Sequence, residues 1–525
     1  MNDTSKNENV FNSSLQKVAK GSAIVFVGSL LSSILIFVGR LIIIRYWSQS
    51  DYGVFSLALV ILTIITIVAS LGMKEGVIRS IAYNRGKKDY KKIPELISTS
   101  ILLSIVTSIF LGIFLFFFSE PMANNIFHDS ALVTPLKVFA FGVPFLTLID
   151  IIVSIFRGFN QVKPTVYFQY ILINLLFPIF LLVVVFFDKS AVNIYYSYIA
   201  SSIVVSILML IYVYKYTTPS EVFSVKSAIS TTGRKLLSFS LPLLGSTMFF
   251  IIVIWTDTLV LGAFKSSSEV GLYNAASPLA QFLSFPLGSI GFIFMPVLSE
   301  LYARKRLNEI RRNFSMITKW LSLITLPLFL IFFLYADTIV TYLFGQEYLL
   351  SANALRILSF GYMIHNISGP NSSALIGIGE NRFIMYNSFA IAILNIILNI
   401  ILIPPYGIEG AATASAIALF AINFIKCLKI YKKIGASPLS RNLIIPSIIS
   451  ILIIFLFYYL FNSYFTLNFW LVILILVFFY ILFAGIVLIT KSLDKEDLDL
   501  LYSIEKKAGI KTKIFEKIMI KFLRK

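Results

Sequence analysis

Several ionisable side chains lie within apolar segments that are long enough to cross a lipid bilayer. Placing such a group at the centre of a bilayer costs about 2.5–3.5 kcal/mol on insertion scales, so these residues usually have a function. An arginine has parallel N–H donors and a charge that burial does not remove, which suits a phosphate or pyrophosphate. A carboxylate could instead bind a coupling cation. The candidates are Arg40, Lys137, Asp150, Asp257, Arg356 and His365.

Several of these candidates also have an ordinary structural interpretation. Arg45, Lys137 and Arg356 lie near the outer ends of their apolar segments, where long cationic side chains can extend to the lipid headgroups. His365 is a lone histidine, and such a residue more often bridges two helices by a hydrogen bond than relays protons. Asp150 has no partner that the sequence reveals, so as a coupling-cation site it is incomplete.

The composition requires a lipid environment. The 525 residues are 58% hydrophobic and 13% charged, whereas soluble domains contain roughly 25% charged residues. Apolar runs near the ~20 residues of a spanning helix recur along the chain, and the alternation in ~10-residue segments that marks a membrane barrel is missing. We therefore expect helices, which satisfy their own backbone polar groups in hydrocarbon.

The sequence predicts an all-α integral membrane protein with about fourteen transmembrane helices. The first apolar segment is too long for the core of a signal peptide, so we expect it to be retained. A single cysteine and two histidines argue against a disulfide or a structural metal site, and no cofactor is expected. The predicted spans are 21–46, 53–72, 96–118, 132–156, 165–187, 192–214, 237–262, 271–298, 317–336, 352–377, 383–403, 409–431, 443–461 and 469–490.

Basic residues crowd alternate loops, which predicts the orientation. Basic loops stay in the cytoplasm, so we expect a multi-pass protein of the cell membrane with both termini cytoplasmic. The formal charge of +19 reflects this topology and attraction to lipid, and needs no nucleic-acid partner. The loop cations include Lys74, Arg79, Arg85, Arg157, Lys163, Arg234, Arg304, Arg311, Lys319, Lys426, Lys429 and Lys433.

The tail, residues 491–525, has the pattern of a basic amphipathic helix. Apolar residues recur four apart from Ile510 to Phe522, with lysines around them. A helix of this kind lies on an anionic membrane surface. The alternative is a solvated helix that only improves solubility.

The two halves of the chain resemble each other. Residues 48–58 (SQSDYGVFSLA) and 266–276 (SSSEVGLYNAA) share the pattern Ser-x-Ser-acid-x-Gly-aliphatic-aromatic-x-x-Ala at an offset of 266 − 48 = 218. Further matches at 219 join Gly158 to Gly377 and Phe141-Gly142 to Phe360-Gly361. Because each repeat holds six spans, the halves share one membrane orientation. Such parallel repeats place the substrate between the halves and transport it by alternating access.

The repeat predicts the domain organisation. We expect a cytoplasmic N-terminus (1–20), an N-terminal six-helix bundle (21–214), a cytoplasmic linker (215–236) and a C-terminal six-helix bundle (237–431). Two extra transmembrane helices (443–490) and the cytoplasmic tail follow.

Polar stripes mark the helix faces that avoid lipid. In the second span Ser56, Thr63, Thr66 and Ser70 share one face, and the equivalent stripe of the eighth span contains Asn274, Ser277 and Gln281. Amides facing lipid would be unfavourable. We expect Asn274 and Gln281 to line a cavity, whereas Ser56 and Ser70 suit a cavity and close helix packing equally.

Arg40 is the leading candidate for an anion ligand. It shares a stripe with Ser22, Ser29 and Ser33, which favours a cavity-facing position. Its repeat equivalent, 40 + 218 = 258, falls one residue from Asp257. The alternative is that Arg40 and Asp257 pair with each other as a clasp between helices.

These residues together resemble a known family. Lys20-Gly-Ser, residues 45–56 (RYWSQSDYGVFS), Ser70-Leu-Gly-Met, residues 267–276 and Gly407-Ile-Glu-Gly-Ala-Ala look like polysaccharide transporters. These are the Wzx-type oligosaccharide flippases of the multidrug/oligosaccharidyl-lipid/polysaccharide (MOP) superfamily. The resemblance covers about residues 15–490.

The resemblance implies a V-shaped, MATE-like pair of bundles that moves a polyprenyl- or dolichyl-(pyro)phosphate-linked oligosaccharide to the outer leaflet. The implied partners are that lipid-linked oligosaccharide, anionic membrane lipids and polysaccharide-assembly proteins. In relatives, cavity cations engage the lipid-linked phosphate. Arg40 matches best by position, and Arg45 and Arg79 match less well. We add Arg356 to the candidate substrate ligands.

Two other functions compete. A cation-coupled multidrug exporter of the MATE branch would share the architecture and would use Asp150 or Asp257 for its coupling ion. A membrane glycosyltransferase or polymerase would need acidic catalytic residues on a substantial external loop. The sequence offers no such loop, so we expect a transporter without catalytic residues rather than an enzyme.

Overall fold

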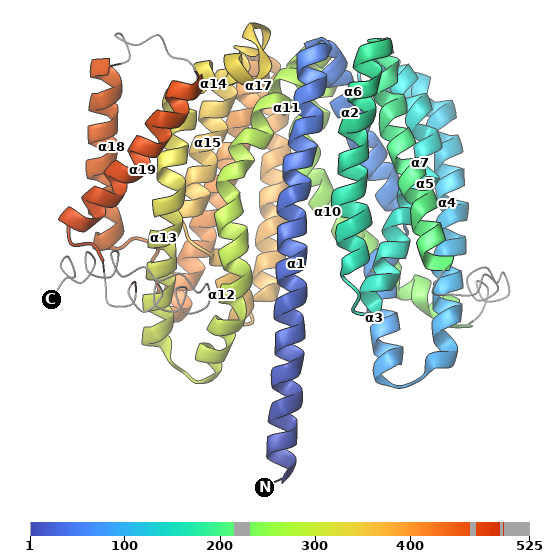
Figure 1. Cartoon of the computed structure of the whole chain (residues 1–525), viewed down its shortest axis with the longest axis horizontal. Helices are drawn as coiled ribbons and strands as arrows, with labels where there is room; N and C mark the ends of the chain where they lie inside the picture. The colour runs from blue at the N-terminus through green and yellow to red at the C-terminus, as the bar shows by residue number, and fades with distance from the viewer. Residues whose placement is uncertain (1, 215–230, 462–468, 494–496, 498–525) are drawn as a thin grey trace. The chain divides into compact units, whose positions relative to one another are not determined.

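A computed structural model describes residues 2–214, 231–461, 469–493 and 497 of the chain. These residues form helices and no strand (Figure 1). Ten of the described helices are long and apolar enough to cross a membrane. The predicted all-α integral membrane fold is therefore confirmed. The amphipathic tail helix predicted from Ile510 onward lies outside the described residues.

The chain divides into two compact units, Met1–Gly271 and Leu272–Lys525. The first unit holds seven long helices, a shorter α3 and the first turn of α11. Its elements are α1 (Asn2–Tyr46), α2 (Gln49–Ala69), α3 (Met73–Gly86), η1 (Tyr90–Lys92), α4 (Ile93–Pro121), η2 (Met122–Ile126), η3 (Ser130–Leu132), α5 (Val133–Gly158), η4 (Thr165–Leu172), α6 (Ile173–Phe187), α7 (Val192–Tyr214), α10 (Thr231–Phe264) and α11 (Ser267–Gln281).

The second unit contains the rest of α11 and the helices that follow. Helix α13 contacts α12, α15, α18 and α19 in this unit. The elements are η5 (Phe282–Ser284), α12 (Phe285–Ala303), α13 (Leu307–Leu334), α14 (Ala336–Phe344), η6 (Gln346–Tyr348), α15 (Ser351–Ile367), α16 (Asn371–Gly377), α17 (Asn381–Ile434), α18 (Arg441–Phe461) and α19 (Phe469–Ile489).

The predicted spans coincide with helical segments, with two differences in detail. Helix α17 runs through two predicted spans, 383–403 and 409–431, but Gly407 inside it has non-helical angles (φ 53, ψ −128) just after Pro404 and Pro405. It is therefore two segments that meet at a kink. The predicted span 352–377 is instead broken between α15 and α16. The total of fourteen spans and the two six-helix bundles stay predictions.

A capping box explains the first part of the repeated motif. Ser48 Oγ accepts from the backbone N–H of Asp51, and the Asp51 carboxylate accepts from the Ser48 N–H, so both satisfy free donors at the start of α2. In the second copy Ser266 Oγ accepts from the Glu269 N–H at 3.4 Å before α11. The Ser-x-Ser-acid pattern thus begins the equivalent helix in each repeat.

The glycines of the same motif bring α2 and the first turn of α11 into contact. A Cβ on Gly53 would lie 1.6 Å from the Ser267 carbonyl oxygen, and one on Gly271 would lie 2.2 Å from the Gln49 carbonyl oxygen. These pairs are exchanged by the repeat offset, since 49 + 218 = 267 and 53 + 218 = 271. Glycine is needed at both positions because the two backbones touch.

The second set of repeat matches also has a backbone explanation. Helix α5 ends at Gly158 and α16 ends at Gly377, and each glycine packs closely on a neighbouring helix. Two residues later Asn160 (φ 61) and Gly379 (φ 84) both adopt the left-handed conformation. Glycine and asparagine tolerate this conformation best, so it ends both helices at equivalent points.

A buried ion pair, with additional hydrogen bonds, joins the chain after α19 to α13. Lys319 Nζ pairs with the Asp497 carboxylate and donates to the Ser492 carbonyl oxygen at 3.1 Å. Trp320 Nε1 donates to Asp497 Oδ1 at 2.9 Å. The side chains of Lys319 and Asp497 are 3% and 0% exposed. The prediction that Lys319 is one of the loop cations is therefore wrong.

Replacing Gly53 with alanine is expected to lower the free energy of unfolding by about 1–3 kcal/mol, because the added methyl overlaps the α11 backbone. Thermal unfolding of the purified protein in detergent measures this change. Gly245→Ala is the control, since a Cβ there meets nothing within 4 Å. An unchanged melting temperature for Gly53→Ala would contradict the close contact.

Removing the Asp497 carboxylate by Asp497→Ala is expected to cost about 3–5 kcal/mol, because Lys319 would keep a buried charge without its partner. Glu309→Ala breaks an exposed ion pair with Arg306 and should change stability by less than ~1 kcal/mol. Equal losses for the two variants in a thermal melt would show that the buried ion pair adds little.

Candidate functional site

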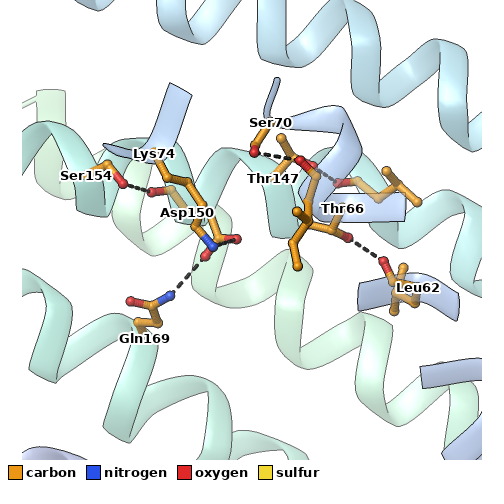
Figure 2. A network of polar contacts seen from close by, with 10 residues as sticks. Leu62, Thr66, Ser70, Lys74, Thr147, Asp150, Ser154 and Gln169 are labelled. Carbon is orange, nitrogen blue, oxygen red and sulfur yellow. Dashed lines mark hydrogen bonds and ion pairs between the residues drawn. The ribbon is translucent and has the colours of Figure 1, made fainter. Parts of the chain in front are cut away.

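A polar network lies inside the first unit (Figure 2). Lys74 Nζ of α3 is 2.6 Å from Asp150 Oδ2 of α5. Gln169 Nε2 of η4 donates to Asp150 Oδ1 at 2.9 Å. Both carboxylate oxygens therefore have a partner, and three segments distant in sequence meet at one carboxylate.

Local backbone features position Lys74 and Gln169. Leu71 (φ 51) and Gly72 (φ 69) are left-handed, and this turn starts α3 so that Lys74 falls in its first turn. A Cβ on Gly72 would lie 2.3 Å from the Ser240 carbonyl oxygen, so the turn packs against α10. Gln169 lies in η4, a π-helical segment. Such wide turns are often found at functional sites.

Hydroxyl groups around the network bond to their own helices. This leaves few free donors in the interior and favours close helix packing for the stripe on α2. The bonds run from Thr66 to the Leu62 carbonyl, Ser70 to Ile67, Thr147 to Val143 and Ser154 to Asp150, at 2.7–2.8 Å.

The pair of Lys74 and Asp150 changes what Asp150 can do. The side chains are 27% and 17% exposed, so the pair is half-buried and neutral overall. A coupling cation at Asp150 would have to displace the Lys74 ammonium. The expectation that Asp150 has no partner is wrong, because its partner was counted among the loop cations.

Arg40 and Asp257 lie in the same unit in different surroundings. Arg40 is half-buried on α1, and its charge acts on the hydroxyl of Tyr52 on α2. Asp257 is buried on α10, which contacts α2 and α3. The phosphate role of Arg40 and the alternative clasp with Asp257 both stay predictions. Arg45, in the last turn of α1, is exposed.

Arg79 and Arg356 have partners within their units. Arg79 is exposed on α3, and its guanidinium carbon lies 4.3 Å from the ring centre of Phe239 on α10. Arg356 on α15 pairs with Asp337 of α14 at 2.5 Å and donates to the Phe333 carbonyl at 3.1 Å. These contacts join α15 to α14, and the substrate-binding role of Arg356 stays a prediction.

The polar residues of α11 differ in exposure. Asn274 is buried, whereas Gln281 is exposed and donates to Ser277 Oγ at 3.3 Å. Their cavity-lining role stays a prediction. His365 on α15 pairs with Asn423 on α17 at 2.8 Å, which confirms its expected role as a hydrogen-bonding residue between helices.

Lys74 and Gln169 are the site residues that sequence reasoning missed. In the sequence, Lys74 looks like one of the basic loop residues that predict the membrane orientation, because it begins a basic segment. Gln169 lies in a predicted span, and the sequence shows no partner for it. The signal that could have found them is the polar Gln169 inside an apolar segment, which requires a partner in the protein interior.

The fold and its polar interior define an all-helical, multi-pass membrane protein. The chain aligns with the structure of lipid II flippase MurJ in an inward-closed conformation, with a TM-score of 0.69 and 18% identity over 88% of this chain and 98% of that one. At this identity the likeness concerns the fold alone.

The polysaccharide biosynthesis protein family model matches residues 18–302, more than half of the chain, and the MatE family model matches residues 242–401. The chain therefore belongs to the polysaccharide biosynthesis protein family, and the resemblance seen in the sequence is confirmed.

Two curated relatives are similar over different lengths. The probable low-salt glycan biosynthesis flippase Agl15 of Haloferax volcanii is 23% identical over 78% of this chain and 82% of its own length. An uncharacterised membrane protein of Methanocaldococcus jannaschii is 26% identical over 42% of this chain and 43% of its own length.

Single substitutions Asp150→Ala and Lys74→Ala are each expected to lower the free energy of unfolding by about 1–3 kcal/mol, since each leaves a half-buried charge without its partner. The double variant should lose less than the sum, because it removes both charges. A thermal double-mutant cycle measures the coupling. If the two single losses of stability simply added up in the double variant, Lys74 and Asp150 would not interact.

Proposed function

We propose that the chain is a flippase that moves a polyprenyl- or dolichyl-(pyro)phosphate-linked oligosaccharide across the cell membrane by alternating access. The oligosaccharide would serve the synthesis of a surface polysaccharide or glycoprotein. Membership of the polysaccharide biosynthesis family supports this proposal. The names of Agl15 and MurJ, both flippases, support it further.

The observation that carries the substrate class is Arg40. It is a half-buried arginine on α1, and its planar set of N–H donors suits a phosphate. Among the other cations in the described part of the chain, Lys74, Lys319 and Arg356 already hold carboxylates. Arg40 is therefore our leading candidate to bind a lipid-linked anion.

A second candidate is a cation-coupled multidrug exporter. The match of the MatE family model to residues 242–401 and the half-buried Asp150 favour it. The pairing of Asp150 with Lys74 weighs against it, because a coupling cation must first displace a tethered ammonium. We therefore prefer the flippase.

The proposal includes the setting of the protein. Basic alternate loops predict that both termini are cytoplasmic, and the basic tail suits anionic lipids. Other candidate partners are proteins that assemble the polysaccharide. Agl15 and MurJ are both named as flippases, and neither name describes an enzyme.

Flipping by reconstituted protein tests the proposal. A fluorescent polyprenyl-diphosphate oligosaccharide in proteoliposomes should reach the opposite leaflet, where a membrane-impermeant quencher detects it. Arg40→Ala should slow flipping about tenfold to a hundredfold, because a hydrogen bond to a charged group contributes about 1.5–3 kcal/mol. Arg40→Lys should lose less, since it keeps the charge without the planar fork.

Arg157→Ala is the matched control, because Arg157 is an exposed arginine at the end of α5. It should flip at the rate of the unmodified chain. Asp257→Ala separates the alternatives. Export of a cationic drug that depends on Asp257, without flipping of a lipid-linked glycan, would overturn the flippase and favour the exporter.

A further inference from the structure

A predicted transmembrane segment of the second unit is broken between α15 and α16. Helix α15 ends at Ile367 and α16 begins at Asn371, with Gly369 left-handed (φ 75) and Pro370 between them. A Cβ on Gly369 would lie 2.3 Å from Thr318 Oγ1 of α13, so the break is packed and requires glycine. Broken helices of this kind often form ion or substrate sites in transporters.

A buried lysine faces this break. Lys426 on α17 is 5% exposed, and its Nζ donates to the Ser372 hydroxyl in the first turn of α16 at 3.0 Å. In the described residues Lys426 has no carboxylate partner. Other lysines of this unit do, since Lys319 holds Asp497 and both Lys429 and Lys433 hold Glu380.

The repeat places a glycine in the second half where the first half has Asp150. At the offset of 219, Asp150 of the first unit corresponds to Gly369, since 150 + 219 = 369. The first unit thus has a lysine–carboxylate pair where the second has a helix break beside a lysine.

The groups around Lys426 accept both of its charge states. A serine hydroxyl can accept from an ammonium or donate to a neutral amine, so Ser372 can stay bonded in either state. The amide oxygens of Asn366 and Asn371, on either side of the break, are buried and accept no hydrogen bond from the described residues. They are free to accept from a proton-carrying group or water.

Burial makes the charge of Lys426 conditional. A buried ammonium without a carboxylate raises the free energy substantially. Lysine can lose this cost by releasing its proton, whereas arginine stays charged. A conformational change that opens or closes the break would therefore change how firmly the proton is held.

We propose that Lys426 binds and releases a proton at the break between α15 and α16, and thereby couples transport to a proton gradient. The inference rests on the proposed flippase function and adds its energy source. The step is balanced, because the ammonium becomes an amine and the proton passes to water on one side of the membrane.

The neighbouring titratable groups do not replace Lys426. His365 of α15 uses Nδ1 to accept from Asn423, and Cys427 contacts Asn371 and Ser368. Helix α16 carries no titratable residue. On α13, Lys319 holds Asp497 and Arg311 donates to the Ile434 carbonyl. Glu380 holds Lys429 and Lys433, and those cations keep the pKa of its carboxyl below the usual range.

Flipping under imposed pH gradients tests the coupling. Proteoliposomes with the full chain and the fluorescent lipid-linked oligosaccharide are given a one-unit gradient in either direction. One pH unit is worth about 1.4 kcal/mol per proton, so each gradient should change the initial rate by up to about tenfold relative to vesicles without a gradient, in opposite senses. A pH indicator inside the vesicles records proton movement independently of the label.

Lys426→Gln should still flip, but its rates under opposite gradients should become equal. Lys426→Arg should also lose the difference, because the guanidinium keeps its proton. Lys426→Met serves if the glutamine variant fails to fold, and size-exclusion chromatography checks folding. Lys432→Gln is the control, since Lys432 is exposed on the same helix, and it should keep the full difference.

Three outcomes would overturn the inference. Lys426→Gln that retains the rate difference would place the proton elsewhere. Flipping by the unmodified chain that ignores the gradient would remove the coupling while leaving the flippase in place. A chain that flips no lipid-linked glycan would contradict the proposed function, and the coupling with it.

Discussion

Hydrocarbon offers no hydrogen-bond partners and no screening, so every polar group within this protein must be satisfied by the protein itself. The backbone meets this demand as helices. Hydroxyl side chains meet it by bonding to carbonyls one turn earlier, as Thr66 and Thr147 do. Several charged side chains meet it in pairs, and these pairs join segments that are far apart in sequence. Lys74 with Asp150 and Lys319 with Asp497 are two examples among the described residues.

The same constraint gives meaning to the internal repeat. The repeated Ser-x-Ser-acid pattern supplies hydrogen-bond partners to the free N–H groups at the start of α2 and α11. The repeated glycine lets these helices touch through their backbones, where van der Waals contact replaces the hydrophobic effect that lipid does not provide. The motif thus serves to start two helices and to let them pack closely. It carries little direct information about the substrate.

Departures from the repeat are the more informative positions for function. Asp150 and Gly369 are equivalent in sequence, yet one completes an ion pair and the other breaks a helix. The uncompensated Lys426 is a place where the second copy differs in charge from the first.

The sequence by itself determined the solvent, the helical class, the repeat and the family, because each depends on composition and on spacing along the chain. Span positions followed from apolar length, and the glycine-marked ends of α5 and α16 from residue type. The tertiary structure decided which charges are structural. Lys74, Lys319 and Lys426 have the same appearance in sequence as true loop cations. Their carboxylate, or its absence, depends on segments up to 178 residues away that only folding brings together.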